Sequence, residues 1–148
     1  MEITVGVNLF GVFHVTRAVL GVMLKNGAGR IINIASEGGK VGGPNLAVYS
    51  TCKAAIIGFT RNLAHEVGPE GVSVVSVCPS IMISERLVKS GLLSANLDES
   101  SLGWSFRRTT IGRVSLADEV ASMVAFLASE AGSYVHGTAI SVGGGFSD

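Results

Sequence analysis

Two short β-branched runs with a long helical stretch between them constrain this chain more than any other feature. RIINIAS (residues 30–36) and VSVVSVCP (residues 72–79) are near-continuous apolar runs, as buried strands are. Residues 46–67 between them carry a helical pattern that ends at EVGPEG, where Gly and Pro favour a helix stop. Strand, helix and strand in this order indicate a parallel sheet whose connections cover its faces.

The rest of the chain continues the alternation of helices and strands. We expect helices over 3–25 and over 115–132 with Ser115 as N-cap, a loop over 37–45, an irregular segment over 80–113 and a third strand within 137–145. The prediction is therefore an α/β fold with three recognisable parallel strands and helices on both faces. Three strands are few for such a sheet, and they leave two open edges.

The charge balance excludes some classes of partner. Lys plus Arg equals Asp plus Glu at 11 each, and no run of like charge occurs, so we expect neither nucleic acid nor an anionic membrane surface. Only 15% of residues are charged, which suggests that part of the surface is covered in an oligomer. Cys52 and Cys78 lack metal-ligand or disulfide-framework spacing, and we interpret them as buried, reduced thiols of a cytoplasmic protein.

The N-terminal segment MEITVGVNLFGVFHVTRAVL does not have the pattern of a signal peptide. It lacks a basic start and a small-residue cleavage site. Asn8, His14, Thr16 and Arg17 interrupt its apolar run and Lys25 ends it, so we expect no membrane span.

The stretch AVYSTCKAA (residues 47–55) places a tyrosine and a lysine on one helical face. Tyr49 and Lys53 are four residues apart, just over one turn, and an ammonium beside a phenol stabilises the phenolate that acid/base catalysis uses. An amphipathic tyrosine with a solvated lysine is the plain alternative. Ser36 ends one predicted strand and Pro79 ends the other, so both reach the rim where parallel sheets bind ligands.

Together these residues resemble the short-chain dehydrogenase/reductase family, which comprises NAD(P)-dependent oxidoreductases. Ser36 lies thirteen positions before Tyr49, Lys53 completes a Y-x-x-x-K motif, and Asn8 lies 28 positions before Ser36, as in the family's Asn-Ser-Tyr-Lys tetrad. RIINIAS, AVYSTCKAAIIGFTRNLAHEV, VSVVSVCP, IGRVSLADEVASMVAFLAS and GTAISVGGG resemble successive blocks of the family. The resemblance covers essentially all 148 residues and implies one partial, truncated Rossmann-like (doubly wound) domain, with a substrate segment at about 80–113.

The resemblance also implies a role for each matching residue. Tyr49 would be the general acid in carbonyl reduction and the base in alcohol oxidation, and Lys53 would support its phenolate and bind the nicotinamide ribose. Ser36 would polarise the substrate oxygen, and Asn8 would fix a water in a proton relay. The implied cofactor is NAD or NADP, and the implied cofactor-binding positions are Tyr49, Lys53, Pro79, Ser80, Ile81 and Ser84.

Some of the family's pattern is absent. Cys78-Pro79-Ser80 stands where Asn-Pro-Gly is common, and Gly143 stands where the family has an aspartate. We find neither G-x-G-x-x-G nor G-x-x-x-x-G-K-[ST], the turns that hold phosphates at a helix N-terminus. The chain therefore resembles the catalytic half of the family without the phosphate-binding half.

Three functional readings follow from this pattern. The first is an oxidoreductase acting on a secondary alcohol or ketone with an apolar body, given Leu92, Leu93, Leu102 and Trp104 in the substrate segment, with the missing half supplied elsewhere. The second is a non-catalytic remnant that assembles as a homodimer or homotetramer through helices 3–25 and 46–67. A lyase or isomerase with Tyr49 as base is the third.

The three histidines are expected to be structural. No carboxylate or cysteine accompanies His14, His65 or His136 at a ligand spacing. We therefore predict no metal site.

Overall fold

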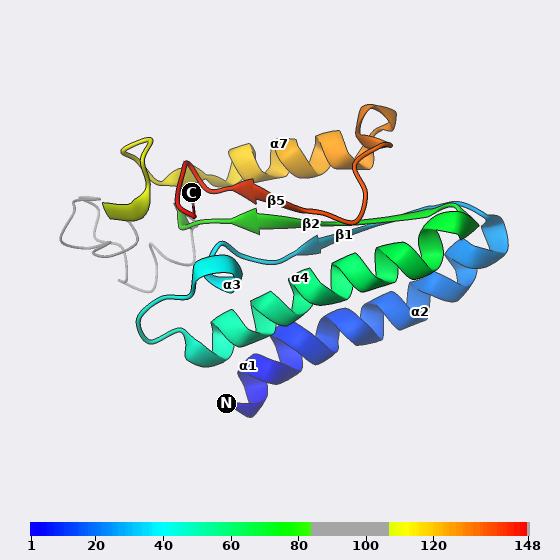
Figure 1. Ribbon diagram of the computed structural model, residues 1–148, viewed down its shortest axis with the longest axis horizontal. Helices are drawn as coiled ribbons and strands as arrows, with labels where there is room; N and C mark the ends of the chain where they lie inside the picture. The colour runs from blue at the N-terminus through cyan, green and yellow to red at the C-terminus, as the bar shows by residue number, and fades with distance from the viewer. Residues whose placement is uncertain (84–106, 148) are drawn as a thin grey trace.

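A parallel sheet covered on both faces forms the centre of the computed structural model, which describes residues 1–83 and 107–147. Its strand order is β1-β2-β5, with β1 at one edge. In Figure 1, α7 covers one face while α4 and α2 lie on the other. The predicted Rossmann-like arrangement with three parallel strands is confirmed. The bounds are Gly29–Ile34 for β1, Val72–Pro79 for β2, Ala139–Val142 for β5, Gly11–Asn26 for α2, Ala47–Val67 for α4 and Ala117–Ala128 for α7.

The register of β1 against β2 continues past the last residue of β1. Within the strands, Ile34 pairs with Val77. Beyond them, the Ala35 N–H donates to the Val77 carbonyl at 2.8 Å, and the Glu37 N–H donates to the Pro79 carbonyl at 2.9 Å. The backbone N–H groups of alternate residues thus point toward β2. The chain around Ser36 stays extended at the carboxyl end of the sheet.

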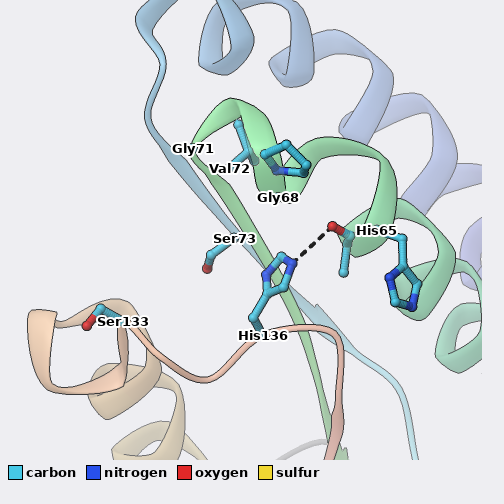
Figure 2. Close-up of a pocket in the computed structure, with 9 residues that line it drawn as sticks. His65, Gly68, Gly71, Val72, Ser73, Ser133 and His136 are labelled. Atoms are coloured by element: carbon cyan, nitrogen blue, oxygen red, sulfur yellow. Dashed lines mark hydrogen bonds between the residues drawn. The ribbon is translucent and has the colours of Figure 1, made fainter.

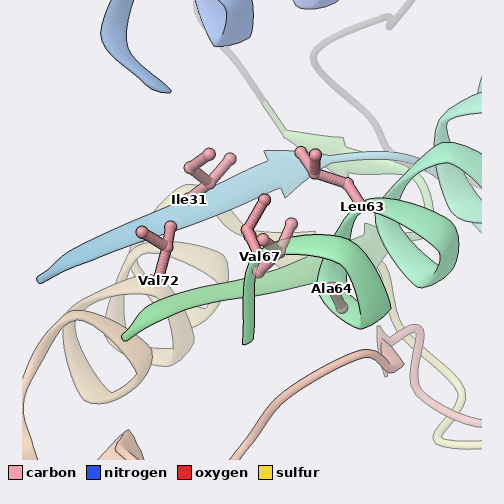
Figure 3. Close-up of a cluster of buried hydrophobic side chains, with 6 residues drawn as sticks. Ile31, Leu63, Ala64, Val67 and Val72 are labelled. Carbon is pink, nitrogen blue, oxygen red and sulfur yellow. The ribbon is translucent and has the colours of Figure 1, made fainter. Parts of the chain in front are cut away.

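Both faces of β2 are buried, which explains its continuous apolar sequence. On the α4 side, Val72 and Val74 join Ile31 and a group of side chains from the last turns of α4 (Figure 3). On the opposite side, Val75 and Val77 pack with the α7 residues Val120 and Leu127. The α4 members of the first cluster are Leu63, Ala64 and Val67.

The N-terminal segment is one continuous helix in three parts. A short α1 (Glu2–Val5) leads into a π-helical turn (Gly6–Phe10). The last part, α2, ends at Asn26, and the C-cap residue Gly27 has a φ of 62°, in the left-handed region. The helical periodicity of the sequence predicted the helix but not the π turn. Packing against α4 includes Phe13 and Phe59, whose ring centroids are 4.7 Å apart.

The outward face of this helix stays apolar. By length and composition alone the helix Glu2–Asn26 could cross a membrane, contrary to our expectation from its interrupting polar residues. Only 6% of the apolar window is buried, and Ile3, Val15 and Val22 are each more than 60% exposed. One such helix is weak evidence for a membrane, because a helix that packs in a soluble assembly has the same composition.

Two local predictions were wrong. Ser115 does not cap a helix: Ser115–Leu116 form the short strand β4, parallel to β3 (Met82–Ile83), and α7 begins at Ala117. The Glu119 carboxylate instead accepts the Leu116 N–H at 2.8 Å. The expected loop over 37–45 contains a short helix, α3 (Gly38–Val41).

His136, in the segment before β5, is hydrogen-bonded to both β2 and α4 at the amino end of the sheet. A pocket of about 520 Å³ opens there (Figure 2). Its Nδ1 accepts the Val74 N–H at 3.1 Å, so the proton is on Nε2, which donates to the Ala64 carbonyl at 3.0 Å. A Cβ on Gly68 would lie 2.8 Å from this ring, which leaves room only for glycine. In the described part of the chain no group of three potential metal ligands occurs.

A buried hydrogen bond between β1 and α4 gives a test of this packing. The Asn33 amide donates to Thr60 Oγ1 at 2.9 Å, and Thr60 is fully buried. Thr60→Val leaves the amide without an acceptor and should lower the free energy of unfolding by about 1–3 kcal/mol in a urea titration. The exposed control Thr51→Val should change it by less than about 0.5 kcal/mol. Equal effects of the two substitutions would show that the Asn33–Thr60 bond does not stabilise the fold.

Candidate active site

Ser36 and Tyr49 reach the same point at the carboxyl end of the sheet. Ser36 follows β1, and Tyr49 lies in the first turn of α4. A Cβ built on Gly38 would lie 3.4 Å from Ser36 Oγ and 3.9 Å from the Tyr49 ring, so the two side chains flank the same glycine. Both side chains are half-buried, which leaves them accessible to a small molecule.

Lys53 lies one turn further along α4. Its Nζ is 5.6 Å from the centroid of the Tyr49 ring and donates to the Ile34 carbonyl at 2.9 Å. Burial lowers the pKa of Lys53, because desolvation disfavours the ammonium. The structure thus brings Ser36, Tyr49 and Lys53 together, and their catalytic roles stay predictions.

A close contact between α3 and α4 sets this geometry. A Cβ on Gly39 would lie only 2.8 Å from the backbone nitrogen of Ala54 and the carbonyl carbon of Lys53. Glycine therefore lets α3 lie directly on the α4 backbone at the level of Lys53. The chain from Ser36 to Tyr49 is held against the helix that it precedes.

Asn8 comes from a different element, the long N-terminal helix. It lies within the π-helical turn, and its amide donates to the Thr4 carbonyl of the preceding turn at 3.0 Å. A π turn widens the helix at one position and often marks a functional site. The helix around Asn8 packs beside α4, and the predicted role of the residue in a proton relay is not tested by this contact.

The predicted nicotinamide border lies at the same rim. Pro79 is buried, Ser80 and Ile81 are half-buried, and the Ser80 N–H donates to the Val142 carbonyl at 3.3 Å. This bond ties the segment to the end of β5. Ser84 and the apolar residues of the expected substrate segment, Leu92, Leu93, Leu102 and Trp104, lie outside the described residues.

Glu37 is a site residue that the sequence analysis missed. It is 1% exposed, and neither carboxylate oxygen has a hydrogen-bond partner in the described part of the chain. Lys40 Nζ lies 3.7 Å from Glu37 Oε1 and donates to Ser141 Oγ. A Cβ on Gly143 would lie 3.0 Å from Glu37 Cγ, so Glu37 fills the space beside this glycine. The sequence carried one signal for this burial: Gly143 stands where the resemblance expects an aspartate, and a glycine leaves space for the Glu37 side chain.

The two cysteines are free and buried, as predicted. Cys78 is fully buried at the end of β2, and desolvation by burial raises the pKa of its thiol. A thiol with a raised pKa carries little thiolate and is a poor nucleophile. Cys78 is therefore not among the candidate nucleophiles of this rim.

Sequence comparisons place the whole chain among known oxidoreductases. A family model described as enoyl-(acyl carrier protein) reductase matches residues 1–147. The chain is 37% identical over 141 residues to a 2-dehydro-3-deoxy-L-rhamnonate dehydrogenase (NAD(+)) of Sphingomonas sp., covering 95% of this chain and 54% of the relative. It is 39% identical over 145 residues to the short-chain dehydrogenase/reductase aba4 of Botryotinia fuckeliana, covering 98% and 55%. The chain thus spans about half the length of these curated relatives.

Solved structures agree with the sequence matches. A 3-oxoacyl-[acyl-carrier protein] reductase from Brucella melitensis superposes with a TM-score of 0.84 and 30% identity, covering 95% of this chain and 50% of that one. A 3-ketoacyl-(acyl-carrier-protein) reductase from the same organism, complexed with NADH, also gives a TM-score of 0.84 at 30% identity, covering 97% and 57%.

The contact between Glu37 and Gly143 predicts coupled effects on stability. Gly143→Ala should lower the free energy of unfolding by about 1–3 kcal/mol, because the new methyl group overpacks the buried Glu37 side chain. In a Glu37→Ala background the same change should cost less than about 0.5 kcal/mol. Gly58→Ala is the control: its Cβ meets nothing within 4 Å, and alanine should stabilise α4. Additive effects of Gly143→Ala and Glu37→Ala would contradict the contact.

Proposed function

The chain belongs to the short-chain dehydrogenase/reductase family, and from this premise we propose that it is the catalytic part of an NAD(P)-dependent oxidoreductase. The proposed reaction transfers hydride between NAD(P) and a secondary alcohol or ketone. The convergence of Ser36, Tyr49 and Lys53 at the end of the parallel sheet supports this proposal most directly.

Tyr49 handles the proton in the proposed reaction. In reduction, the carbonyl carbon gains a hydride and the carbonyl oxygen gains the phenolic proton; in oxidation both transfers run in reverse. The hydroxyl of Tyr49 has no hydrogen-bond partner among the described residues, so it is available to a substrate oxygen. A phenol aimed at the rim of a parallel sheet suits this task.

Ser36 orients the substrate oxygen. Its Oγ accepts the Gly38 N–H at 3.1 Å, so one lone pair is engaged and the hydroxyl hydrogen stays free. That hydrogen can be donated to a carbonyl oxygen, which stabilises the negative charge that develops there during reduction.

Lys53 and Asn8 complete the proposed set. The Lys53 ammonium lies 5.6 Å from the centroid of the Tyr49 ring, and we propose that it binds the nicotinamide ribose beside the phenol. Asn8, from the π-helical turn beside α4, is proposed to hold a water that links this lysine to solvent.

We propose that the rim holds one end of a dinucleotide. Tyr49 and Lys53 would offer polar groups to a ribose, and Pro79, Ser80 and Ile81 would border the nicotinamide ring. When bound, the cofactor supplies or accepts the hydride. The sequence has no G-x-G-x-x-G turn, and we propose that another segment binds the pyrophosphate. The proposal includes both NAD and NADP; names of relatives that specify NAD(+) or NADH support this cofactor class.

The exposed apolar helix favours a second, structural function. Val15 and Val22 are 65% and 63% exposed on the long N-terminal helix. We propose that a cytoplasmic homodimer or homotetramer covers part of this face, through the helices expected over 3–25 and 46–67. A non-catalytic assembly of this kind remains the alternative to the enzyme.

Replacement of the proposed acid/base tests the enzyme. Tyr49→Phe should lower kcat by about 1,000-fold or more, because the ring stays in place while the transferable proton is lost. Tyr134→Phe is a matched control, since Tyr134 is fully exposed and remote from the rim. NADH and NADPH consumption with a panel of ketones is measured for the chain alone and with the unmatched half of the Sphingomonas relative added.

Two results would count against the proposal. Retention of full activity in Tyr49→Phe would exclude Tyr49 as the acid/base. If the folded wild-type chain showed no turnover, either alone or with the unmatched half added, the non-catalytic assembly would be favoured.

A further inference from the structure

A second serine hydroxyl lies beside the candidate site. Ser50 follows Tyr49 on α4, in a position that the Y-x-x-x-K motif leaves open. A Cβ built on Gly38 would lie 3.5 Å from Ser50 Oγ and 3.4 Å from Ser36 Oγ. The two serine oxygens therefore lie around one common point above Gly38.

The Ser50 hydroxyl is buried without a partner. Its Oγ is shielded from solvent, and no described residue donates a hydrogen bond to it or accepts one from it. Burial of a hydroxyl without a hydrogen bond is costly for a fold, and the large majority of buried side-chain polar groups have a partner. An exception beside a candidate catalytic serine therefore needs an explanation.

The helix offers this hydroxyl an ordinary partner that it does not use. A serine or threonine in a helix commonly donates to the carbonyl four residues earlier. The neighbouring Thr51 does so, to the Ala47 carbonyl at 2.9 Å. The Leu46 carbonyl, four residues before Ser50, accepts the Ser50 backbone N–H at 2.7 Å but not the Ser50 hydroxyl. The hydroxyl lies on the side of Gly38 instead.

Ser36 has an acceptor position left for this hydroxyl. Ser36 Oγ accepts the Gly38 N–H at 3.1 Å, which engages one of its two lone pairs. The second lone pair can accept the hydroxyl hydrogen of Ser50. A change of the Ser50 side chain to another staggered rotamer moves its oxygen by about 2 Å, so the hydroxyl can adjust while α4 stays in place.

We propose that Ser50 is a positioning residue for Ser36: its hydroxyl donates to Ser36 Oγ when Ser36 donates to a bound substrate oxygen. Successive hydrogen bonds polarise one another, so a donor behind Ser36 strengthens the bond that Ser36 makes in front. Ser50 acts through Ser36 because its own oxygen is buried. The contact between the two serines is a property of the chain itself, and only its effect on turnover rests on the proposed function.

A thiol at position 36 reports this contact in the 148-residue chain alone. In Ser36→Cys, the thiolate should draw the Ser50 hydroxyl hydrogen, because a hydrogen bond to the charged form favours that form. Addition of Ser50→Ala should therefore raise the pH midpoint of iodoacetamide alkylation by about one unit, which is tenfold in thiolate at a given pH. Alkylation is followed by mass spectrometry of the peptide that contains position 36, since Cys52 and Cys78 are buried. Thr51→Ala removes an exposed hydroxyl one position further along and should leave the midpoint unchanged.

Urea unfolding of the chain separates positioning from a structural role. Thr60→Val removes a buried hydroxyl that is bonded to Asn33, and the urea midpoint should fall. Ser50→Ala removes a buried hydroxyl that has no partner among the described residues, so the urea midpoint should stay the same or rise. A group that is kept at a cost to stability is typical of a functional site.

Turnover tests the consequence for the reaction, with the unmatched half of the Sphingomonas relative added. Ser50→Ala should lower kcat about tenfold with little change in KM, because the supported bond strengthens as charge develops on the substrate oxygen. Ser50→Thr keeps a hydroxyl and should retain most of the wild-type kcat. In a Ser36→Ala background, Ser50→Ala should have no further effect, since Ser50 acts only through Ser36.

Three results would overturn the proposal. An alkylation midpoint that Ser50→Ala leaves unchanged would exclude the contact, and a urea midpoint lowered as much as by Thr60→Val would give Ser50 a structural role. Independent effects of Ser36→Ala and Ser50→Ala on kcat would show that Ser50 does not act through Ser36. A shifted alkylation midpoint without any ketone reduction would refute the proposed function, while the contact between the two serines stands.

Discussion

The hydrogen bonds that extend the β1–β2 register beyond Ile34 are the constraint on which the site depends. The Glu37 N–H bonded to the Pro79 carbonyl keeps the chain extended at the carboxyl end of the sheet. The Ser36 side chain, between the two residues bonded to β2, flanks Gly38 together with the Tyr49 ring. If this register moved by one residue, the side chain at position 36 would exchange faces with its neighbours and the approach to Tyr49 would be lost.

The second constraint is the close contact of two helices at Gly39. Because α3 lies directly on the backbone of α4 near Lys53, the short connection from Ser36 to Tyr49 has little freedom. The buried carboxylate of Glu37 fills the space beside Gly143 and joins this connection to the end of β5. Strand register and helix contact together place a hydroxyl, a phenol and an ammonium at one rim, and we propose that this arrangement transfers the proton.

Much of this arrangement was predictable from local patterns in the sequence, and the predictions that were wrong or missing have physical causes. Continuous β-branched runs predicted the strands because both faces of β2 are buried, and the spacing of Ser36, Tyr49 and Lys53 predicted their convergence. The pairing of Ser115 with β3 was missed, because a two-residue strand depends on a partner over thirty positions away. The burial of Glu37 was missed for a similar reason: its neighbour Gly143 comes from the other end of the chain.

A calorimetric titration with NADH and then NADPH tests most directly whether this chain is a catalytic half whose cofactor site needs another segment for the phosphates. The 148-residue chain alone should show no micromolar binding of either dinucleotide, because its rim is proposed to hold only the nicotinamide end and the sequence has no G-x-G-x-x-G turn for the phosphates. With the unmatched half of the Sphingomonas relative added, micromolar binding should appear. Micromolar binding to the chain alone would contradict this division of the site, because the chain would then hold the phosphates by itself.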